Sequence, residues 1–283
     1  MRVLVTGGAG LLGSALMAGA PEWAEAHATR RNTPVAEGVR AHAVDLADAA
    51  AVDALLDELR PGVVIHAAVG TKEGERDIVH ATRNVALACG RTGAALIHVS
   101  TDALLDGEGA PYAEEAAPAP VHAYGRFKTR AEDAVRSLLP AAAVARTSLI
   151  VRDDPPDSVS AWTLDALRRG ERLRLFVDEM RCPIAADDLA AQLWEIAALP
   201  AERRAGVWHL VGPEMVSRFS LGMMLAVRHG LDTALLHPTL SRSHTGEPRP
   251  RDLRMLTTRA DRELSTRPRP VSQVLFPPAA PTS

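Results

Sequence analysis

The sequence predicts an α/β protein built on a doubly wound parallel sheet, with a smaller lobe toward the C-terminus. Three observations support this fold class. Short apolar runs alternate with longer segments of helical periodicity, a glycine-rich turn follows the first run, and the alternation stops near residue 150. Continuous apolar strands that alternate with helices are typical of a parallel sheet covered by helices on both faces.

The predicted strands and helices follow one another regularly in the first half of the chain. Apolar runs suited to buried strands occupy residues 3–5, 26–29, 41–44, 63–65, 95–99 and 142–145. Apolar residues at helical spacing predict helices at residues 11–20, 49–59, 78–89 and 124–139. Later in the chain, strands are expected at residues 172–176 and 207–211, and helices at residues 188–198 and 221–230.

The change of pattern near residue 150 suggests a division of the chain. We expect residues 1–150 to form the main domain and residues 151–275 to form a smaller lobe that shares the last strands of the sheet. A loop rich in Asp and Pro at residues 153–157 marks the change. Residues 276–283 are expected to be a flexible tail.

The composition favours a protein that acts on small molecules. The chain has 283 residues, 47% hydrophobic and 24% charged, with a formal net charge of -3. A nucleic-acid or membrane partner would need a concentrated positive field, so neither is expected. Cys89 and Cys182 form no C-x-x-C pair, and no signal peptide or spanning segment is evident, which predicts a reduced, cytoplasmic protein. His98 and His209 are expected to be core histidines with satisfied ring nitrogens, and no metal site is expected.

Residues 6–13 read T-G-G-A-G-L-L-G, directly after the first strand and at the start of the first helix. The last six satisfy G-x-G-x-x-G, which allows a tight turn, close approach of the backbone to a pyrophosphate, and a helix N-terminus with free N–H groups. A glycine-rich turn without a ligand is the alternative. The expected cofactor-binding residues here are Gly7, Gly10, Leu11, Leu12 and Gly13.

The end of the second strand indicates which dinucleotide binds. An acidic residue there would accept the ribose 2′-OH of NAD, whereas arginine accommodates the 2′-phosphate of NADP. Arg30 and Arg31 stand at this place, so NADP(H) is favoured over NAD(H). Ordinary solvated arginines are the alternative. Asp45 and Leu46, after the third strand, are expected to border the adenine, and a helix N-cap is the alternative role for Asp45.

Tyr124 and Lys128 lie four residues apart, which places both side chains on one face of a helix. A lysine near a tyrosine stabilises the phenolate and lowers the pKa of the phenol, so that a proton can be transferred near neutral pH. Thr101 ends the fifth predicted strand, where a hydroxyl faces the ligand crevice and can hydrogen-bond a substrate carbonyl. Alternatively, these residues serve only structure.

In combination, these motifs resemble those of the extended short-chain dehydrogenase/reductases, and within them the dTDP-4-dehydrorhamnose reductase group. The resemblance rests on T-G-x-x-G-x-x-G at 6–13, H-A-A at 66–68, N-V at 84–85, S-T-D-x-x-x-D-G at 100–107, P-Y-x-E at 111–114, Y-G-R-x-K at 124–128, R-T-S at 146–148 and R-P-R-D-L at 249–253. It covers nearly the whole chain and is sharpest up to residue 150.

The resemblance implies a Rossmann fold whose first 150 residues bind NADP, and an oxidoreductase of deoxysugar biosynthesis that reduces a dTDP-type, nucleotide-linked 4-keto-6-deoxysugar. Tyr124 would donate the proton to the ketone oxygen, and Thr101 would hydrogen-bond that oxygen. Lys128 would tune Tyr124 and bind the nicotinamide ribose. Residues lining the cofactor would include Ala67, Ala68 and Val69. A homodimer is the default assembly.

The chain departs from the group at positions where members carry aromatic residues. Here these positions hold Ala103, Leu105 and Leu149. Aromatic rings there could stack on a base, a sugar or the nicotinamide, so their absence leaves the identity of the sugar or other ketone open. Asp102, Arg181 and Arg249 are expected to contact the substrate, the arginines because guanidinium matches a diphosphate. A surface ion pair is the alternative for each arginine.

Other functions on the same scaffold remain open. Sugar dehydratases carry Asp-Glu after the threonine, whereas Ala103 follows Asp102 here, which disfavours elimination; a nucleotide-sugar epimerase stays an alternative. The regulatory β subunit of methionine adenosyltransferase resembles the same group, so a non-catalytic NADP-binding subunit is another. The intact set of Thr101, Tyr124 and Lys128 favours an enzyme.

Overall fold

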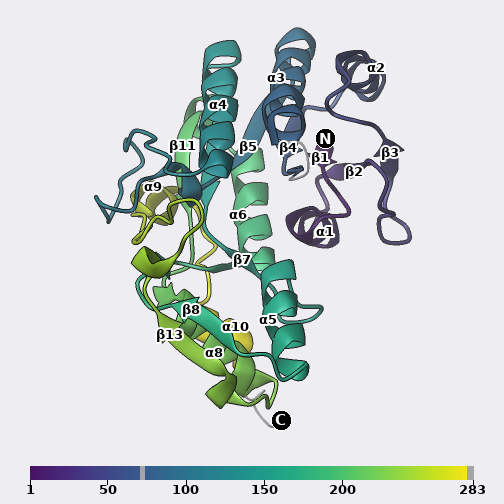
Figure 1. Cartoon of the computed structure of the whole chain (residues 1–283). Helices are drawn as coiled ribbons and strands as arrows, with labels where there is room; N and C mark the ends of the chain where they lie inside the picture. Colours follow the sequence, from purple (N-terminus) through teal and green to yellow (C-terminus); the bar gives the residue numbers. More distant parts are fainter. Residues whose placement is uncertain (71–73, 279–283) are drawn as a thin grey trace.

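The computed structural model describes residues 1–70 and 74–278 of the chain. Its centre is a seven-stranded sheet in the order β11-β6-β5-β4-β1-β2-β3, with every neighbouring pair parallel (Figure 1). The strands are β1 (Arg2–Thr6), β2 (Glu25–Arg30), β3 (Ala41–Ala43), β4 (Val63–His66), β5 (Ala95–Thr101), β6 (Ala143–Thr147) and β11 (Gly206–Leu210). The predicted fold class is confirmed.

Helices cover both faces of this sheet. One face is packed by α1 (Leu11–Ala18) and α6 (Ala186–Ala198), and the other by α2 (Ala49–Leu59), α3 (Ala81–Thr92) and α4 (Ala123–Leu138), as Figure 1 shows. Successive strand residues point to opposite faces. In β1, Val3 and Val5 join the core beneath α1 and α6, whereas Leu4 joins the core beneath α2 and α3. Both faces are buried, which explains the continuously apolar strands.

The strand order reverses at β1. The chain passes from β1 outward to β2 and β3, and then returns to β4 on the other side of β1. The loops after β1 and β4 therefore diverge at the carboxyl edge of the sheet, which opens the crevice where open α/β sheets bind their ligands. The glycine turn follows β1 and residues 67–69 follow β4, so both border this crevice, whereas Asp45 and Leu46 follow the edge strand β3.

A second group of elements forms the lobe, which lies below the sheet in Figure 1. Its helices are α5 (Ser158–Arg168), α8 (Arg218–Arg228) and α10 (Val271–Leu275). Its strand pairs are β7 (Ile150–Val151) with β10 (Ile184–Ala185), β8 (Leu173–Phe176) with β13 (Leu236–Thr239), and β9 (Met180–Arg181) with β12 (Val216–Ser217). Short helical segments complete the chain: η1 (Glu75–His80), η2 (Asp102–Leu104), α7 (Ala201–Arg204), η3 (Thr233–Leu235), η4 (Ser241–Ser243) and α9 (Thr258–Glu263).

The main sheet draws on both halves of the chain. Residues beyond 150 contribute the outer strand β11 and the covering helix α6, and Trp208 of β11 is fully buried in the core. The helix expected at residues 78–89 opens with a π-helical turn, η1, before α3 begins. Of the expected tail, residues 279–283 lie outside the described residues.

Candidate active site

A cavity of about 1190 Å³ runs along the carboxyl edge of the sheet and reaches the lobe. Its walls include the glycine turn after β1, the ends of β2, β4 and β5, the start of α4, and residues of α5, β9 and α8. All the residues predicted to bind cofactor or substrate or to act in catalysis line it, including Gly7, Arg30, Thr101, Tyr124 and Arg249. The fold therefore brings the dispersed motifs of the sequence into one space.

The glycine turn is shaped by close backbone packing. Gly7 adopts a φ of 75°, a left-handed conformation that favours glycine. A Cβ atom on Gly13 would lie 2.1 Å from the carbonyl oxygen of Gly7, so no side chain fits there. Gly10 precedes α1 and brings no side-chain cap to it. The N-terminal backbone of α1 thus faces the cavity in the arrangement that suits a pyrophosphate.

Charged residues gather where β2 and β3 end. Arg30 lines the cavity and has no ion-pair partner among the described residues. Arg31 instead pairs with Asp77 of η1, with 2.9 Å between Nη1 and Oδ1. Asp45 pairs with Arg76 and accepts a hydrogen bond from the backbone of residue 47. Its alternative role as helix cap is wrong, because the side chain that caps α2 belongs to Asp48.

A buried polar chain fixes the backbone that follows β4. The hydroxyl of Thr6 accepts a hydrogen bond from the backbone N–H of Ala68 at 3.0 Å, and lies 2.7 Å from Nδ1 of His66. Nε2 of His66 lies 3.0 Å from the hydroxyl of Thr82. Burial, followed by the nearby charge of Lys128, lowers the pKa of His66 to about 3, so its ring is neutral. Ala67, Ala68 and Val69 line the cavity as expected.

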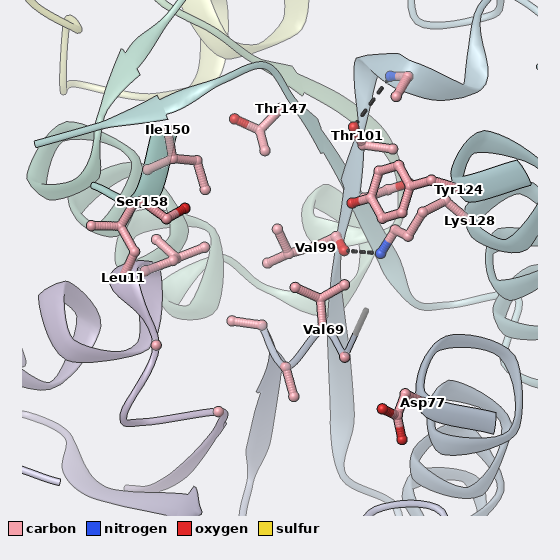
Figure 2. Close-up of a pocket in the computed structure, with 18 of the residues that line it drawn as sticks. Leu11, Val69, Asp77, Val99, Thr101, Tyr124, Lys128, Thr147, Ile150 and Ser158 are labelled. Atoms are coloured by element: carbon pink, nitrogen blue, oxygen red, sulfur yellow. Dashed lines mark hydrogen bonds between the residues drawn. The ribbon is translucent and has the colours of Figure 1, made fainter. Parts of the chain in front are cut away.

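Helix α4 carries Tyr124 and Lys128, the predicted catalytic pair. It begins after His122, whose Nδ1 accepts a hydrogen bond from the backbone N–H of Gly125 at 3.0 Å. The helix places Tyr124 and Lys128 side by side, and Thr101 at the end of β5 faces the phenol ring (Figure 2). Lys128 donates a hydrogen bond to the carbonyl oxygen of Val99 at 2.8 Å. The three predicted catalytic side chains are thus together in the cavity.

The pKa values of Tyr124 and Lys128 differ from those expected from the sequence. Burial lowers the pKa of Lys128 to about 8, partly offset by Glu132. For Tyr124, loss of hydration and the nearby carboxylate of Asp102 raise the pKa to about 12, while contact with Thr101 acts in the opposite direction. The expected lowering of the pKa of Tyr124 is therefore wrong for the free protein. Its phenol stays protonated near neutral pH, the form that a proton donor needs.

Asp102 lies directly behind Thr101 and is buried. Its Oδ2 accepts a hydrogen bond from the hydroxyl of Ser148 at 2.7 Å and lies 3.9 Å from Nε of Arg181. Burial raises the pKa of Asp102, while Arg181 and Ser148 hold the increase back. Ser148 belongs to the R-T-S signature and lines the cavity, although the sequence alone did not indicate its role as a partner of Asp102.

Three arginines converge on one buried glutamate at the lobe end of the cavity. Arg249 makes two hydrogen bonds of 3.0 Å to Glu179, and Arg218 makes one of 3.0 Å. Arg181 lies 3.1 Å from the same carboxylate. Although burial opposes ionisation, these cations lower the pKa of Glu179. With Glu179 and Asp102 both charged, these three guanidinium groups face two carboxylates, and Glu247 also lines the cavity beside Arg249.

Arg218 was missed by sequence reasoning. It stands at the start of α8, far from the other site residues in the chain, and no motif marks it. Its Nη1 is buried and finds no hydrogen-bond partner among the residues that the structure describes. A guanidinium nitrogen left in this state next to a cavity is suited to an anionic ligand.

The positions that lack the group's aromatic residues divide into two kinds. Ala103 and Leu149 line the cavity. Leu105 is fully buried and packs in a separate apolar cluster with Cys182 and Leu253. The suggestion that a ring at position 105 would stack on a ligand is therefore wrong for this chain, and only two of the three substitutions open space in the cavity.

The ring nitrogens of the core histidines have fewer hydrogen-bond partners than expected. Both ring nitrogens of His98 lack partners within residues 1–70 and 74–278, and so does Nε2 of His209, whose Nδ1 lies 3.0 Å from the carbonyl oxygen of Leu256. In the described part of the chain, no group of three or more His, Cys, Asp or Glu side chains is arranged to hold a metal ion. No helix among the described residues has the length and apolarity to span a membrane.

Comparison with known families identifies the group. The family model described as the RmlD substrate binding domain matches residues 1–276. The chain belongs to this family. The match spans both the sheet and the lobe. The resemblance to the dTDP-4-dehydrorhamnose reductase group is thereby confirmed.

Relatives include a reductase and a subunit of methionine adenosyltransferase. The chain is 32% identical over 263 residues to a dTDP-4-keto-6-deoxy-D-glucose reductase of Streptomyces niveus, covering 88% of this chain and 86% of the relative. It is 30% identical over 272 residues to methionine adenosyltransferase 2 subunit beta of Xenopus tropicalis, covering 88% and 78%. A dTDP-4-dehydrorhamnose reductase from Bacillus anthracis, crystallised with NADP, superposes with a TM-score of 0.83 at 20% identity over 97% of each chain.

Proposed function

We propose that this protein is an NADPH-dependent reductase of a keto group on a nucleotide-linked, dTDP-type 4-keto-6-deoxysugar. The observation that carries the proposal is the meeting of Thr101, Tyr124 and Lys128 in the cavity that also holds the glycine turn. The name of the Streptomyces niveus relative supports the substrate class, and the Bacillus anthracis structure supports the cofactor.

The residues present fit a nicotinamide dinucleotide. The uncapped N-terminus of α1 and the glycine turn would hold the pyrophosphate, and Arg30, which has no ion-pair partner in the described part of the chain, would meet a 2′-phosphate. Asp45 and Leu46 line the cavity where the adenine would lie, and Val69 lines its middle. When bound, the cofactor would supply the hydride.

The chain's own groups would handle the proton and the developing charge. Tyr124, protonated in the free protein, would give its proton to the ketone oxygen as negative charge grows there, and Thr101 would donate a hydrogen bond to the same oxygen. Lys128 would hold the cofactor ribose and keep a positive charge beneath the phenol. In the free protein the Thr101 hydroxyl donates to Oδ1 of Asp102 at 3.4 Å, so it would turn this proton from Asp102, which Ser148 holds in place, to the ketone oxygen when substrate binds.

The arginine cluster supports an anionic substrate. Arg181, Arg218 and Arg249 around Glu179 would meet the diphosphate of a nucleotide sugar, because planar guanidinium groups match phosphate oxygens. The sugar would then reach Tyr124 at the centre of the cavity. The missing rings at Ala103 and Leu149 leave extra room beside the reacting carbon, so the enzyme would accept a sugar shaped differently from the rhamnose precursor.

Replacement of Tyr124 tests the proposed mechanism. With dTDP-4-keto-6-deoxy-D-glucose as substrate, Tyr124→Phe is expected to lower NADPH oxidation by about 10²- to 10⁴-fold, the usual contribution of a general acid. Tyr112→Phe is the matched control, because the only other tyrosine in the chain does not line the cavity. Unchanged turnover in Tyr124→Phe, with wild-type circular dichroism and melting temperature, would refute the assignment.

A non-catalytic regulatory subunit is the second candidate, favoured by the 30% identity to methionine adenosyltransferase 2 subunit beta. It would bind NADPH tightly, leave a broad panel of nucleotide-linked ketones unreduced, and co-purify with a partner enzyme. Stoichiometric release of NADP⁺ during turnover would contradict it. The same release would also argue against an epimerase, which keeps its cofactor bound throughout the reaction.

A further inference from the structure

The adenosine end of the cavity contains an ion-pair network to which the proposed reaction assigns no role. Nη1 of Arg31 and Nη1 of Arg76 lie 2.9 Å and 3.2 Å from the same oxygen, Oδ1 of Asp77. Arg76 also pairs through Nη2 with Asp45. Among the described residues, this network joins two guanidinium groups to two carboxylates, and three of its members, Arg31, Asp45 and Asp77, line the cavity.

Asp77 is the buried member of this network. Its side chain is 4% exposed, compared with 44% for that of Arg31. A Cβ atom on Gly70 would lie 2.3 Å from Oδ2 of Asp77, so the backbone after β4 packs directly on the carboxylate. In Figure 2 Asp77 lies beyond Val69, well away from the tyrosine. A buried carboxylate requires cationic partners, and Asp77 therefore holds the Arg31 guanidinium at the edge of the cavity.

The network can release Arg31 without leaving Asp77 unpaired. If Arg31 turned toward a ligand, Nη1 of Arg76 would still lie on Oδ1 of Asp77, so the buried charge would not be left alone. The 2′-phosphate of NADP would compete with Asp77 for the Arg31 guanidinium, because carboxylate and phosphate are alternative partners for arginine. NAD has a hydroxyl at this position and would leave the ion pair in place.

We propose that Asp77 is a specificity-determining residue, an internal anion that occupies Arg31 when the bound dinucleotide lacks a 2′-phosphate. The inference rests on the proposed function, since it requires a nicotinamide dinucleotide in the cavity. It follows that NADP binding must exchange one anion for another on Arg31, whereas NAD binding exchanges none. Asp77 thus reduces the preference for NADP that Arg30 and Arg31 would otherwise create.

The test compares two fragments of the cofactor, 2′,5′-ADP and 5′-ADP, by calorimetry on the full chain. Asp77→Asn keeps the shape of the side chain and removes its charge. The affinity for 2′,5′-ADP is expected to rise roughly tenfold, as for one charge-assisted hydrogen bond set free, while the affinity for 5′-ADP stays constant. Glu37→Gln is the matched control, because it removes an exposed charge from the loop after β2 without touching Arg31.

Two further measurements separate the outcomes. In an Arg31→Gln background, Asp77→Asn should no longer change the ratio of the two affinities, which shows that Asp77 acts through Arg31. In a crystal structure of the wild-type chain with 2′,5′-ADP, Arg31 should contact the phosphate while Arg76 remains on Asp77. This structure decides the question even if Asp77→Asn fails to fold.

Other results would contradict either the role of Asp77 alone or the proposed function as well. Equal weakening of both fragments by Asp77→Asn, or Arg31 still paired with Asp77 in the complex, would overturn the role of Asp77 and leave the proposed function intact. A wild-type chain that binds neither fragment would overturn the proposed function together with this inference.

Discussion

Lys128 is a buried cation. Its side chain is buried, and it donates to the Val99 carbonyl oxygen at 2.8 Å. The pKa falls from 10.5 to about 8, mainly because burial penalises the ammonium, and Glu132 compensates only in part. The native chain therefore binds this proton less tightly than the unfolded chain does, so the charged Lys128 lowers the stability of the fold.

Lys128→Met should raise stability at neutral pH. Below pH 8 both states of the wild type hold the proton, so the native state bears the full penalty, which amounts to about 3 kcal/mol at 1.36 kcal/mol per pKa unit. Between pH 8 and 10.5 only the unfolded state keeps the proton, so wild-type stability rises relative to the variant and the difference shrinks. Urea unfolding of both proteins at pH 7 and pH 10 measures this. A difference independent of pH would contradict the explanation.

Individual site residues were predictable where a short spacing or a strand end marks them. Tyr124 and Lys128 are one helical turn apart, and Thr101 ends a strand that the apolar pattern reveals. Glu179 and Arg218 are 39 residues apart in the chain and Arg31 and Asp77 are 46 apart, so only tertiary packing brings each pair together. The pKa of Tyr124 was misjudged because Asp102 and burial act on it, and neither effect can be read from the Y-x-x-x-K spacing.

At the scale of elements, α4 is locked to the sheet by a buried ion pair. Arg146 of β6 donates to Glu132 of α4 at 2.9 Å through Nη2, and both side chains are 1% exposed. Arg146 also donates to the carbonyl oxygen of Ala116 at 2.9 Å. The pair fixes the helix two turns beyond Tyr124 and one turn beyond Lys128, and so fixes the position of both side chains.

Glu132→Gln should destabilise the chain and disturb the site. Removing one partner of a buried pair leaves an uncompensated charge, which costs about 3–5 kcal/mol. Arg130→Ala on the same helix is the control, because Arg130 pairs with Glu75 at the surface and should contribute less than about 1 kcal/mol. Chemical denaturation measures both variants. Equal, small effects would show that α4 does not depend on this pair.

The elements of the main sheet were predictable because their apolar runs and helical periods are long enough to be distinctive. The elements of the lobe were harder to predict. Its strands β7, β9, β10 and β12 have two residues each, too few for any alternation to show. The π-helical opening of the helix expected at residues 78–89 also escaped detection, because one widened turn leaves the apolar period of the following helix unchanged.

At the scale of the whole molecule, the lobe supplies the arginine cluster at one end of a cavity that also runs along the carboxyl edge of the sheet. Glu179 joins Arg218 of α8 to Arg249, a residue of the loop that leads to α9. Fully buried, it holds these side chains in place before any ligand arrives. Binding of a diphosphate would then require little ordering of flexible arginines, which improves affinity.

Arg218→Ala should weaken binding of dTDP by roughly 10- to 100-fold, the value of one charge-assisted hydrogen-bonding group. Arg228→Ala is the matched control, because it lies at the other end of α8 and pairs with Asp153 away from the cavity. Isothermal calorimetry with dTDP measures the effect without any need for turnover. Equal affinities of the two variants would exclude Arg218 from the nucleotide site.

The position of β11 has a consequence for how the chain folds. This strand forms one edge of the seven-stranded sheet, beside β6, yet it is synthesised only after the first two hundred residues of the chain. Until then, the core lacks the Trp208 ring, and α6 has an incomplete sheet to pack against. The growing chain on the ribosome therefore exposes the edge of β6, a site for wrong pairing, until residues 206–210 emerge.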